Sequence, residues 1–304
     1  MLWIQSTETG NENMNNKTKG VWYAILAAAF YALNAPLSKL LLGHVPPTMM
    51  AAFLYLGAGL GMAVMQLVEN RTGFSAREQR LTRSELPYTI GMVVLDIAAP
   101  IALMVGITRT SAANASLLNN FEIVATSLIA MCLFREAISP KLWLGIALVT
   151  LSSAILSVQD VSSFSFSAGS VFVLIACVCW GFENNCTRML SSKNPVQIVV
   201  IKGIFSGLGA LVIALVTGER FPGAGQMLLA LALGFVAYGL SIVFYIYAQR
   251  VLGAAKTSAY YAIAPFIGVA MSLVIFREVP SLTFLIALAV MIAGACVVTA
   301  ADQG

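Results

Sequence analysis

Charge is the scarcest property of this sequence, since only 10% of its 304 residues are Asp, Glu, Lys or Arg. A soluble domain carries about 25% charged residues because its water-facing surface needs them. A soluble fold is therefore excluded, and so is a disordered chain, which depends on a high content of polar and charged residues. The net charge of +4 is too small to indicate binding to nucleic acid.

Groups that hold metals and cofactors are also few. His44 is the single histidine, so histidine cannot assemble a zinc or haem site, and we expect no metal and no cofactor. The five cysteines all fall within apolar segments, where they are typical of packing residues and predict no disulfide. No Walker lysine loop is present, so ATP is not expected to drive the protein directly.

Hydrophobic residues, in contrast, make up 59% of the chain. A helix that crosses the hydrocarbon core of a bilayer needs roughly 20 apolar residues. Runs of about that length predict an all-α membrane protein with ten transmembrane helices. The predicted spans are residues 20–42, 48–69, 86–108, 112–134, 141–159, 168–189, 196–217, 226–248, 254–276 and 282–301.

The basic residues predict the orientation. Residues 1–19 are polar and are expected to form a disordered cytoplasmic tail rather than a signal peptide, because a full-length apolar run follows. With that end inside, the cytoplasmic basic residues are Lys17, Lys19, Arg71, Arg77, Arg80, Arg83, Arg135, Lys141, Arg188, Lys193, Arg250 and Lys256. The opposite side has only Lys39, Arg109, Arg220 and Arg277. This bias follows the positive-inside rule, and ten spans place both termini in the cytoplasm.

The two halves of the chain resemble each other. The matching positions are Lys39 with Arg188, Pro46 with Pro195, and the Phe-Arg-Glu sequence of residues 134–136 with that of residues 276–278. Each half contains five spans, an odd number, so the second half must enter the membrane in the opposite sense. We predict two inverted five-helix repeats, residues 20–160 and 167–301, an arrangement that many carriers use for alternating access.

These features resemble the EamA branch of the drug/metabolite transporter superfamily. The resemblance rests on the ten spans, the five-plus-five repeat, the pairs Tyr31-Ala32 and Trp180-Gly181, and the short turns that follow spans four and nine. It covers nearly the whole chain after residue 19. It implies a carrier of the bacterial inner membrane, mainly an exporter of amino acids and other metabolites, with a central cavity among spans 3, 4, 8 and 9 and parts of spans 1 and 6. Pro265 matches a proline that the family often has in span nine, whereas Ile123 stands at the equivalent position of span four.

Four ionisable residues lie inside the spans, where each costs roughly 2.5–3.5 kcal/mol on insertion scales. Asp96 and Glu122 lie near the middle of spans three and four. Glu183 and Lys202 lie about six residues from the cytoplasmic ends of spans six and seven, at a common depth of about 9 Å. This common depth predicts a buried ion pair, which either locks the two spans together or takes part in transport.

Polar side chains are densest in span four. Ser116, Asn119 and Asn120 fall on one stripe of a continuous helix, with Glu122 at the edge of the stripe. Ile123 falls on the same stripe, and the counterparts of Ser116, Asn119 and Ile123 on span nine are Ser258, Tyr261 and Pro265. We expect the two stripes to line a substrate cavity; the alternative is that these groups only form hydrogen bonds between helices.

Glu122 is the first candidate for proton coupling, because a desolvated carboxylate can take up and release a proton, and Asp96 is the second. The other candidate cavity residues are Asn34, Trp180, Glu183, Lys202 and Tyr238. Pro36 and Pro265 remove backbone hydrogen bonds within their spans and are candidate hinges.

The sequence thus predicts a secondary transporter that exports a small metabolite, such as an amino acid, across the bacterial inner membrane. Its energy would come from the proton gradient or from the substrate's own gradient. The alternatives are an uncoupled facilitator or exchanger and, from a different class, an intramembrane enzyme, for which Asp96 and Glu122 are the only candidate pair. We favour transport over catalysis. The expected partners are the substrate, membrane lipid and protons, and the expected state is a monomer, with a dimer as the alternative.

Overall fold

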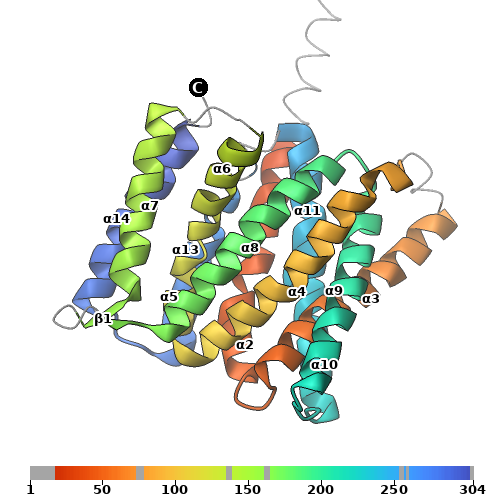
Figure 1. The fold of residues 1–304 in the computed structure, drawn as a ribbon, viewed down its shortest axis with the longest axis horizontal. Helices are drawn as coiled ribbons and strands as arrows, with labels where there is room; N and C mark the ends of the chain where they lie inside the picture. The colour runs from red at the N-terminus through yellow and green to blue at the C-terminus, as the bar shows by residue number, and fades with distance from the viewer. Residues whose placement is uncertain are drawn as a thin grey trace, which may run out of the picture.

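The computed structural model describes residues 18–72, 79–134, 139–160, 165–252, 257 and 260–301, and this part of the chain is almost entirely helical (Figure 1). The first half contains the helix Thr18–Leu41, which ends in α2 (Asn34–Leu41), then α3 (Pro47–Thr72), η2 (Arg83–Glu85), α4 (Leu86–Arg109), α5 (Ala112–Leu118), α6 (Phe121–Phe134) and α7 (Pro140–Ser157). The second half contains α8 (Ala168–Leu190), α9 (Pro195–Val216), α10 (Ala224–Gly234), the π-helical η3 (Phe235–Leu240), α11 (Ser241–Leu252), α13 (Ala264–Phe276) and α14 (Leu282–Ala301).

Between the halves, β1 (Val158–Asp160) and β2 (Ser165–Phe166) form a short antiparallel pair, with Val158 opposite Phe166. This pair is the one departure from an all-α fold in the described chain. The predicted disordered tail lies outside the described residues except for Thr18 and Lys19, which are helical, so the first span begins before residue 20.

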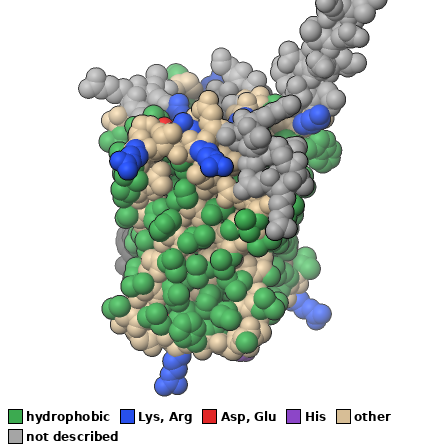
Figure 2. Space-filling model, turned by 90° about the vertical axis from the view of Figure 1, so that its right-hand side faces the viewer, with side chains coloured by type: hydrophobic (Ala, Val, Ile, Leu, Met, Phe, Trp, Pro, Cys, Tyr) green, Lys and Arg blue, Asp and Glu red, His purple; other side chains and the backbone are tan. Residues whose placement is uncertain are grey.

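Each predicted span coincides with a helical segment. Seven helices of the described chain are long and apolar enough to cross a membrane. Spans five, nine and ten correspond to shorter apolar helices, Pro140–Leu156, Ala264–Phe276 and Leu282–Val297. Figure 2 shows that hydrophobic side chains cover the middle of one face of the molecule, whereas Lys and Arg lie towards its two ends. This distribution fits a protein with its middle in lipid and its ends at the membrane surfaces.

The helices pack side by side as a bundle, with α7 and α14 at one edge and α3, α9 and α10 at the other (Figure 1). The most extensive contacts join α3 to α9, α4 to α8, and α7 to α14. Tyr55, Met92 and Leu103 are among the largest fully buried side chains between these helices.

At the crossing of α3 and α9 the two backbones touch, because Gly59 and Gly203 face each other. A Cβ atom on Gly203 would lie 2.3 Å from the backbone nitrogen of Gly59, and a Cβ atom on Gly59 would lie 2.5 Å from the nitrogen of Ile204. No larger residue fits at either position without separating the helices. Small residues at such crossings let membrane helices gain close van der Waals packing.

We expect Gly203→Ala to destabilise the folded protein by about 1–3 kcal/mol, because the added methyl group must push two backbones apart. The measurement is thermal unfolding in detergent. Gly225→Ala in α10 is the matched control, since a Cβ atom there has nothing within 4 Å, and it should leave the unfolding temperature unchanged or raise it. Equal unfolding temperatures for the two variants would show that the crossing tolerates a side chain.

Spans four and nine are not the continuous helices that were expected. A turn at residues 119–120 separates α5 from α6, and a turn at residues 262–263 precedes α13. At these turns backbone N–H groups donate to the carbonyl three residues earlier, as in a 3₁₀ helix, rather than four residues earlier as in an α-helix. Glu122 N donates to Asn119 O and Phe266 N donates to Ile263 O, each over 3.1 Å. A similar turn at Leu33 precedes α2. The central polar groups therefore lie beside backbone discontinuities.

Candidate functional site

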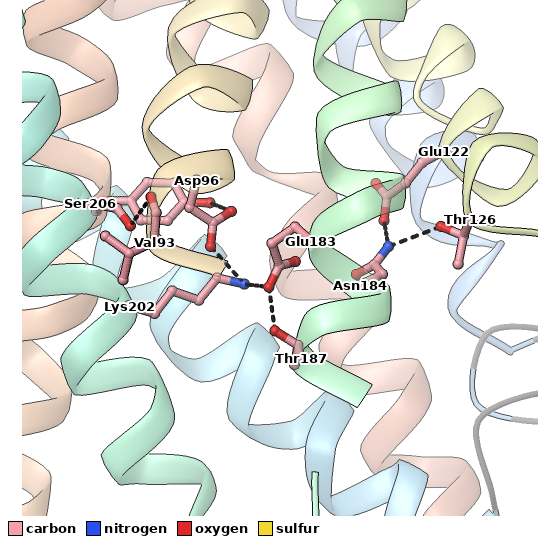
Figure 3. A network of polar contacts seen from close by, with 10 residues as sticks. Val93, Asp96, Glu122, Thr126, Glu183, Asn184, Thr187, Lys202 and Ser206 are labelled. Atoms are coloured by element: carbon pink, nitrogen blue, oxygen red, sulfur yellow. Dashed lines mark hydrogen bonds and ion pairs between the residues drawn. The ribbon is translucent and has the colours of Figure 1, made fainter. Parts of the chain in front are cut away.

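A lysine and two carboxylates from three helices meet inside the bundle (Figure 3). Lys202 Nζ on α9 lies 2.9 Å from Glu183 Oε1 on α8 and 3.1 Å from Asp96 Oδ2 on α4. The three side chains are only 6%, 3% and 0% exposed, respectively. We call this cluster the Lys202 triad. The predicted pair of Glu183 and Lys202 is confirmed, whereas the contact of Asp96 with the same ammonium group was not predicted.

Hydroxyl groups complete the surroundings of the Lys202 triad. Tyr55 Oη on α3 donates a hydrogen bond of 2.8 Å to Asp96 Oδ1, and the Thr187 hydroxyl donates to Glu183 Oε1. Tyr55 and Thr187 are functional candidates that the sequence analysis missed. Thr187 follows Glu183 by one helical turn, a spacing that could have indicated the contact, but no pattern in the sequence connects Tyr55 with Asp96.

Glu122, at the start of α6, belongs to a second polar group (Figure 3). Its Oε1 accepts a hydrogen bond of 2.6 Å from Asn184 Nδ2, which also lies 3.3 Å from Thr126 Oγ1. Glu122 forms no ion pair with any residue in the described part of the chain. Asn184 was also missed, although an amide next to Glu183 in an apolar span is a recognisable signal. Asp96 and Glu122 therefore have separate partners in the described chain.

Aromatic rings gather around Tyr31 from four spans. Its ring centroid lies 6.4 Å from that of Trp180, 6.0 Å from that of Tyr238 and 5.8 Å from that of Tyr261. Asn34 Nδ2 donates a hydrogen bond of 2.9 Å to Tyr238 Oη, so the amide at the start of α2 also belongs to this group. The structure thus brings together Asn34, Trp180, Tyr238 and Tyr261, which the sequence predicted as site residues, and adds Tyr31.

Three buried polar atoms in this region have no hydrogen-bond partner among the described residues. They are Tyr31 Oη, Ser116 Oγ and Asn120 Oδ1. An unsatisfied buried polar atom costs free energy. The hydroxyls of Tyr31 and Ser116 can therefore donate a hydrogen bond to a bound molecule or accept one from it, and Asn120 Oδ1 can accept one. Tyr31 and Asn120 lie on different spans, beside the discontinuities of spans one and four.

The remaining predicted residues fall beside the turns. Asn119 and Asn120 form the turn of span four, where Asn120 Nδ2 donates to Leu117 O at 3.3 Å. The expected stripe on one continuous helix is therefore wrong, because Asn119 and Asn120 lie in the turn that separates Ser116 on α5 from Glu122 on α6. Ser258 lies outside the described residues.

Both candidate hinge prolines occupy the first turn of the helix that follows a discontinuity, Pro36 in α2 and Pro265 in α13. A proline is tolerated there because its missing N–H would have had no helical partner. Whether these turns move during function stays a prediction. Span four is interrupted without any proline.

A bundle of membrane-length apolar helices that encloses ionised, amide and aromatic groups beside broken helices is the architecture of a membrane transport protein. The model of the EamA-like transporter family matches residues 18–158 and again residues 167–300. The chain therefore belongs to the EamA-like transporter family.

Relatives and a solved structure agree with this assignment. The chain is 27% identical over 272 residues to an uncharacterised transporter of Methanothermobacter thermautotrophicus. This alignment covers 84% of this chain and 78% of the relative. It is 20% identical over 245 residues to the uncharacterised transporter YyaM of Bacillus subtilis, and this alignment covers 78% of this chain and 79% of YyaM. A crystal structure with 16% sequence identity shares the fold, with a TM-score of 0.63 over 93% of this chain and 95% of the other.

Proposed function

We propose that this EamA-like transporter is a secondary carrier that exports a small polar metabolite, such as an amino acid, across the bacterial inner membrane in exchange for protons. The observation that carries the proposal is the pair of polar groups buried in the bundle, one around Lys202 and one around Glu122. Ionisable groups inside a membrane usually belong to a path for ions or substrate.

The proposed mechanism is alternating access between two inverted five-helix repeats, residues 20–160 and 167–301. Three observations support it. The family model matches the two halves separately. The discontinuities at residues 119–120 and 262–263 fall at nearly equivalent positions of the halves. Equivalent spans also pack against each other, since span two (α3) contacts span seven (α9) and span five (α7) contacts span ten (α14).

The substrate site in this proposal lies where spans one, four, six, eight and nine meet. Its proposed members are Asn34, Ser116, Asn119, Asn120, Glu122, Trp180, Tyr238, Ser258 and Tyr261, with Asp96, Glu183 and Lys202 beside them. Amide and hydroxyl groups can bind the carboxyl, amine or hydroxyl groups of a metabolite without adding charge. Glu122 is the proposed coupling group, because its carboxylate has one amide donor and no cationic partner in the described chain. The proposal includes both termini in the cytoplasm, which the positive-inside rule supports because most Lys and Arg residues then lie on the cytoplasmic side.

The experiment is transport by the purified protein in liposomes. A binding screen of amino acids, nucleosides and cationic drugs first finds a substrate. A pH gradient imposed across the liposome membrane should then drive accumulation of that substrate. Transport at a rate that does not depend on the pH gradient would instead support the uncoupled facilitator or exchanger. The absence of any transported compound would contradict the proposal as a whole.

We expect Tyr31→Phe to weaken substrate binding without destabilising the protein, because the deleted hydroxyl has no protein partner in the described chain. Tyr238→Phe is the matched control. It removes a hydroxyl that accepts a hydrogen bond from Asn34, so it should lower the unfolding temperature. The measurements are the substrate dissociation constant and thermal unfolding. If Tyr31→Phe destabilised the protein as much as Tyr238→Phe, the proposed contact with substrate would lose its support.

A further inference from the structure

The Lys202 triad contains one more carboxylate than it has cations. Asp96 and Glu183 both contact the single ammonium group of Lys202. Neither carboxylate lies within ion-pair distance of a second lysine or arginine in the part of the chain that the structure describes. When all three groups are ionised, the cluster carries one excess negative charge in a buried site, and such an uncompensated charge is strongly unfavourable.

The other titratable groups that face the triad do not supply the missing positive charge. Tyr55 on α3 donates a hydrogen bond to Asp96, and the ring of Tyr238 on η3 lies 5.0 Å from that of Tyr55. Cys179 and Cys186 on α8 are the nearby thiols. Glu122 on α6 acts on the same centre through its interactions with Glu183 and Lys202. These neighbours are phenols, thiols and a further acid. The cation that balances the excess carboxylate must therefore come from solution.

The contacts identify Asp96 as the excess carboxylate. Lys202 Nζ donates a hydrogen bond of 2.9 Å to Glu183 Oε1, and these two residues lie on neighbouring spans of the second half. The contact of Lys202 with Asp96 is 3.1 Å long, and this ammonium group is the single partner of the buried Asp96 Oδ2 in the described chain. Asp96 lies on α4, so its ion pair joins the first half of the chain to the second at this centre, beside the hydrogen bond of 3.1 Å from Ser206 Oγ to Val93 O.

We propose that the ion pair of Asp96 with Lys202 holds the two halves of the carrier together and is opened and closed by a proton on Asp96, independently of Glu122. We call this ion pair the clasp. A proton from one aqueous side forms an O–H bond with Asp96 Oδ2, which makes this carboxyl neutral and ends its ion pair with Lys202. The balanced pair of Lys202 and Glu183 stays within the second half, and α4 is released. Loss of the proton to the other side restores the carboxylate and closes the clasp. This inference rests on the proposed transport function, because the clasp acts only if the halves move.

The test compares two substitutions that remove the same charge from the same cluster. Asp96→Asn leaves the clasp permanently open, so substrate counterflow should continue and should lose the part of its pH dependence that Asp96 contributes. Glu183→Gln makes Asp96 the single counter-ion of Lys202, which keeps the clasp closed, so counterflow should fall to the background of empty liposomes. A merely structural triad predicts similar counterflow rates for the two variants, since each retains one ion pair. Similar rates would overturn the proposal.

Infrared spectroscopy gives a second measurement that needs no transport. In the difference between spectra at acidic and alkaline pH, the protonated-carboxyl band should contain one component that Glu122→Gln leaves in place and Asp96→Asn removes. Persistence of the whole band in Asp96→Asn would show that Asp96 does not titrate. Absence of any transport by the wild-type protein would contradict the proposed function, whereas the infrared result decides the protonation of Asp96 independently.

Discussion

Replacing Lys202 with methionine is expected to lower the free energy of unfolding by about 3–5 kcal/mol, because two buried carboxylates would lose their shared cation. Methionine keeps most of the apolar volume of the lysine side chain, so the effect reports the charge rather than a cavity. The measurement is thermal unfolding in detergent, together with the yield of folded protein.

A matched control uses a lysine at the membrane surface. Lys193 lies 3.5 Å from Glu85, and both side chains are partly exposed. Such a pair contributes about 0–1 kcal/mol, so Lys193→Met should leave unfolding nearly unchanged. Asp96→Asn and Glu183→Gln added to Lys202→Met should restore much of the stability, because no charge then remains in the triad. Equal unfolding temperatures for Lys202→Met and Lys193→Met would contradict the buried cluster.

Replacing Glu122 with glutamine is expected to abolish accumulation driven by a pH gradient while substrate counterflow continues. Glutamine keeps an oxygen that can accept from Asn184, as Glu122 Oε1 does over 2.6 Å, but it cannot exchange a proton. Substrate can still occupy the site and move down its own gradient. The measurements are uptake with an imposed pH gradient and counterflow without one, in the same liposomes.

Glu85→Gln provides the comparison for Glu122→Gln. Glu85 lies at the start of α4, where its carboxylate bonds to Thr82 and Ser84 at the surface, so proton-driven uptake should persist in that variant. An unchanged pH dependence of uptake in Glu122→Gln would remove Glu122 as the coupling group.

The helices could be predicted because their cause is local. A span needs about 20 apolar residues, and this requirement is written directly in the sequence. The pair of Glu183 and Lys202 could also be predicted from the sequence, because the two residues lie at the same distance from the ends of adjacent antiparallel helices. Their depths along the chain are enough to bring them together.

The other contacts of the candidate site could not be predicted, because they depend on how the helices tilt and cross. Counting residues along α4 placed Asp96 near the middle of its span, away from Lys202, yet the two side chains lie 3.1 Å apart. The turn of span four was missed because it contains no proline. Asn120 instead donates a side-chain hydrogen bond to Leu117 O, a contact of the kind by which asparagine competes with helical backbone bonding. The contact of Tyr55 with Asp96 joins spans two and three, and only the packed structure reveals it.

The direct backbone contact of Gly59 with Gly203 bears on how the carrier moves. Where side chains interlock between two helices, tilting one helix forces many rotamers to change together. At the Gly59–Gly203 contact backbone meets backbone, with the side chains of Ile204 and Leu56 beside it, so few side chains have to repack at this point as the angle between the helices changes. We therefore expect this crossing to act as the fulcrum of the carrier, with the same close contact in the inward-facing and outward-facing states.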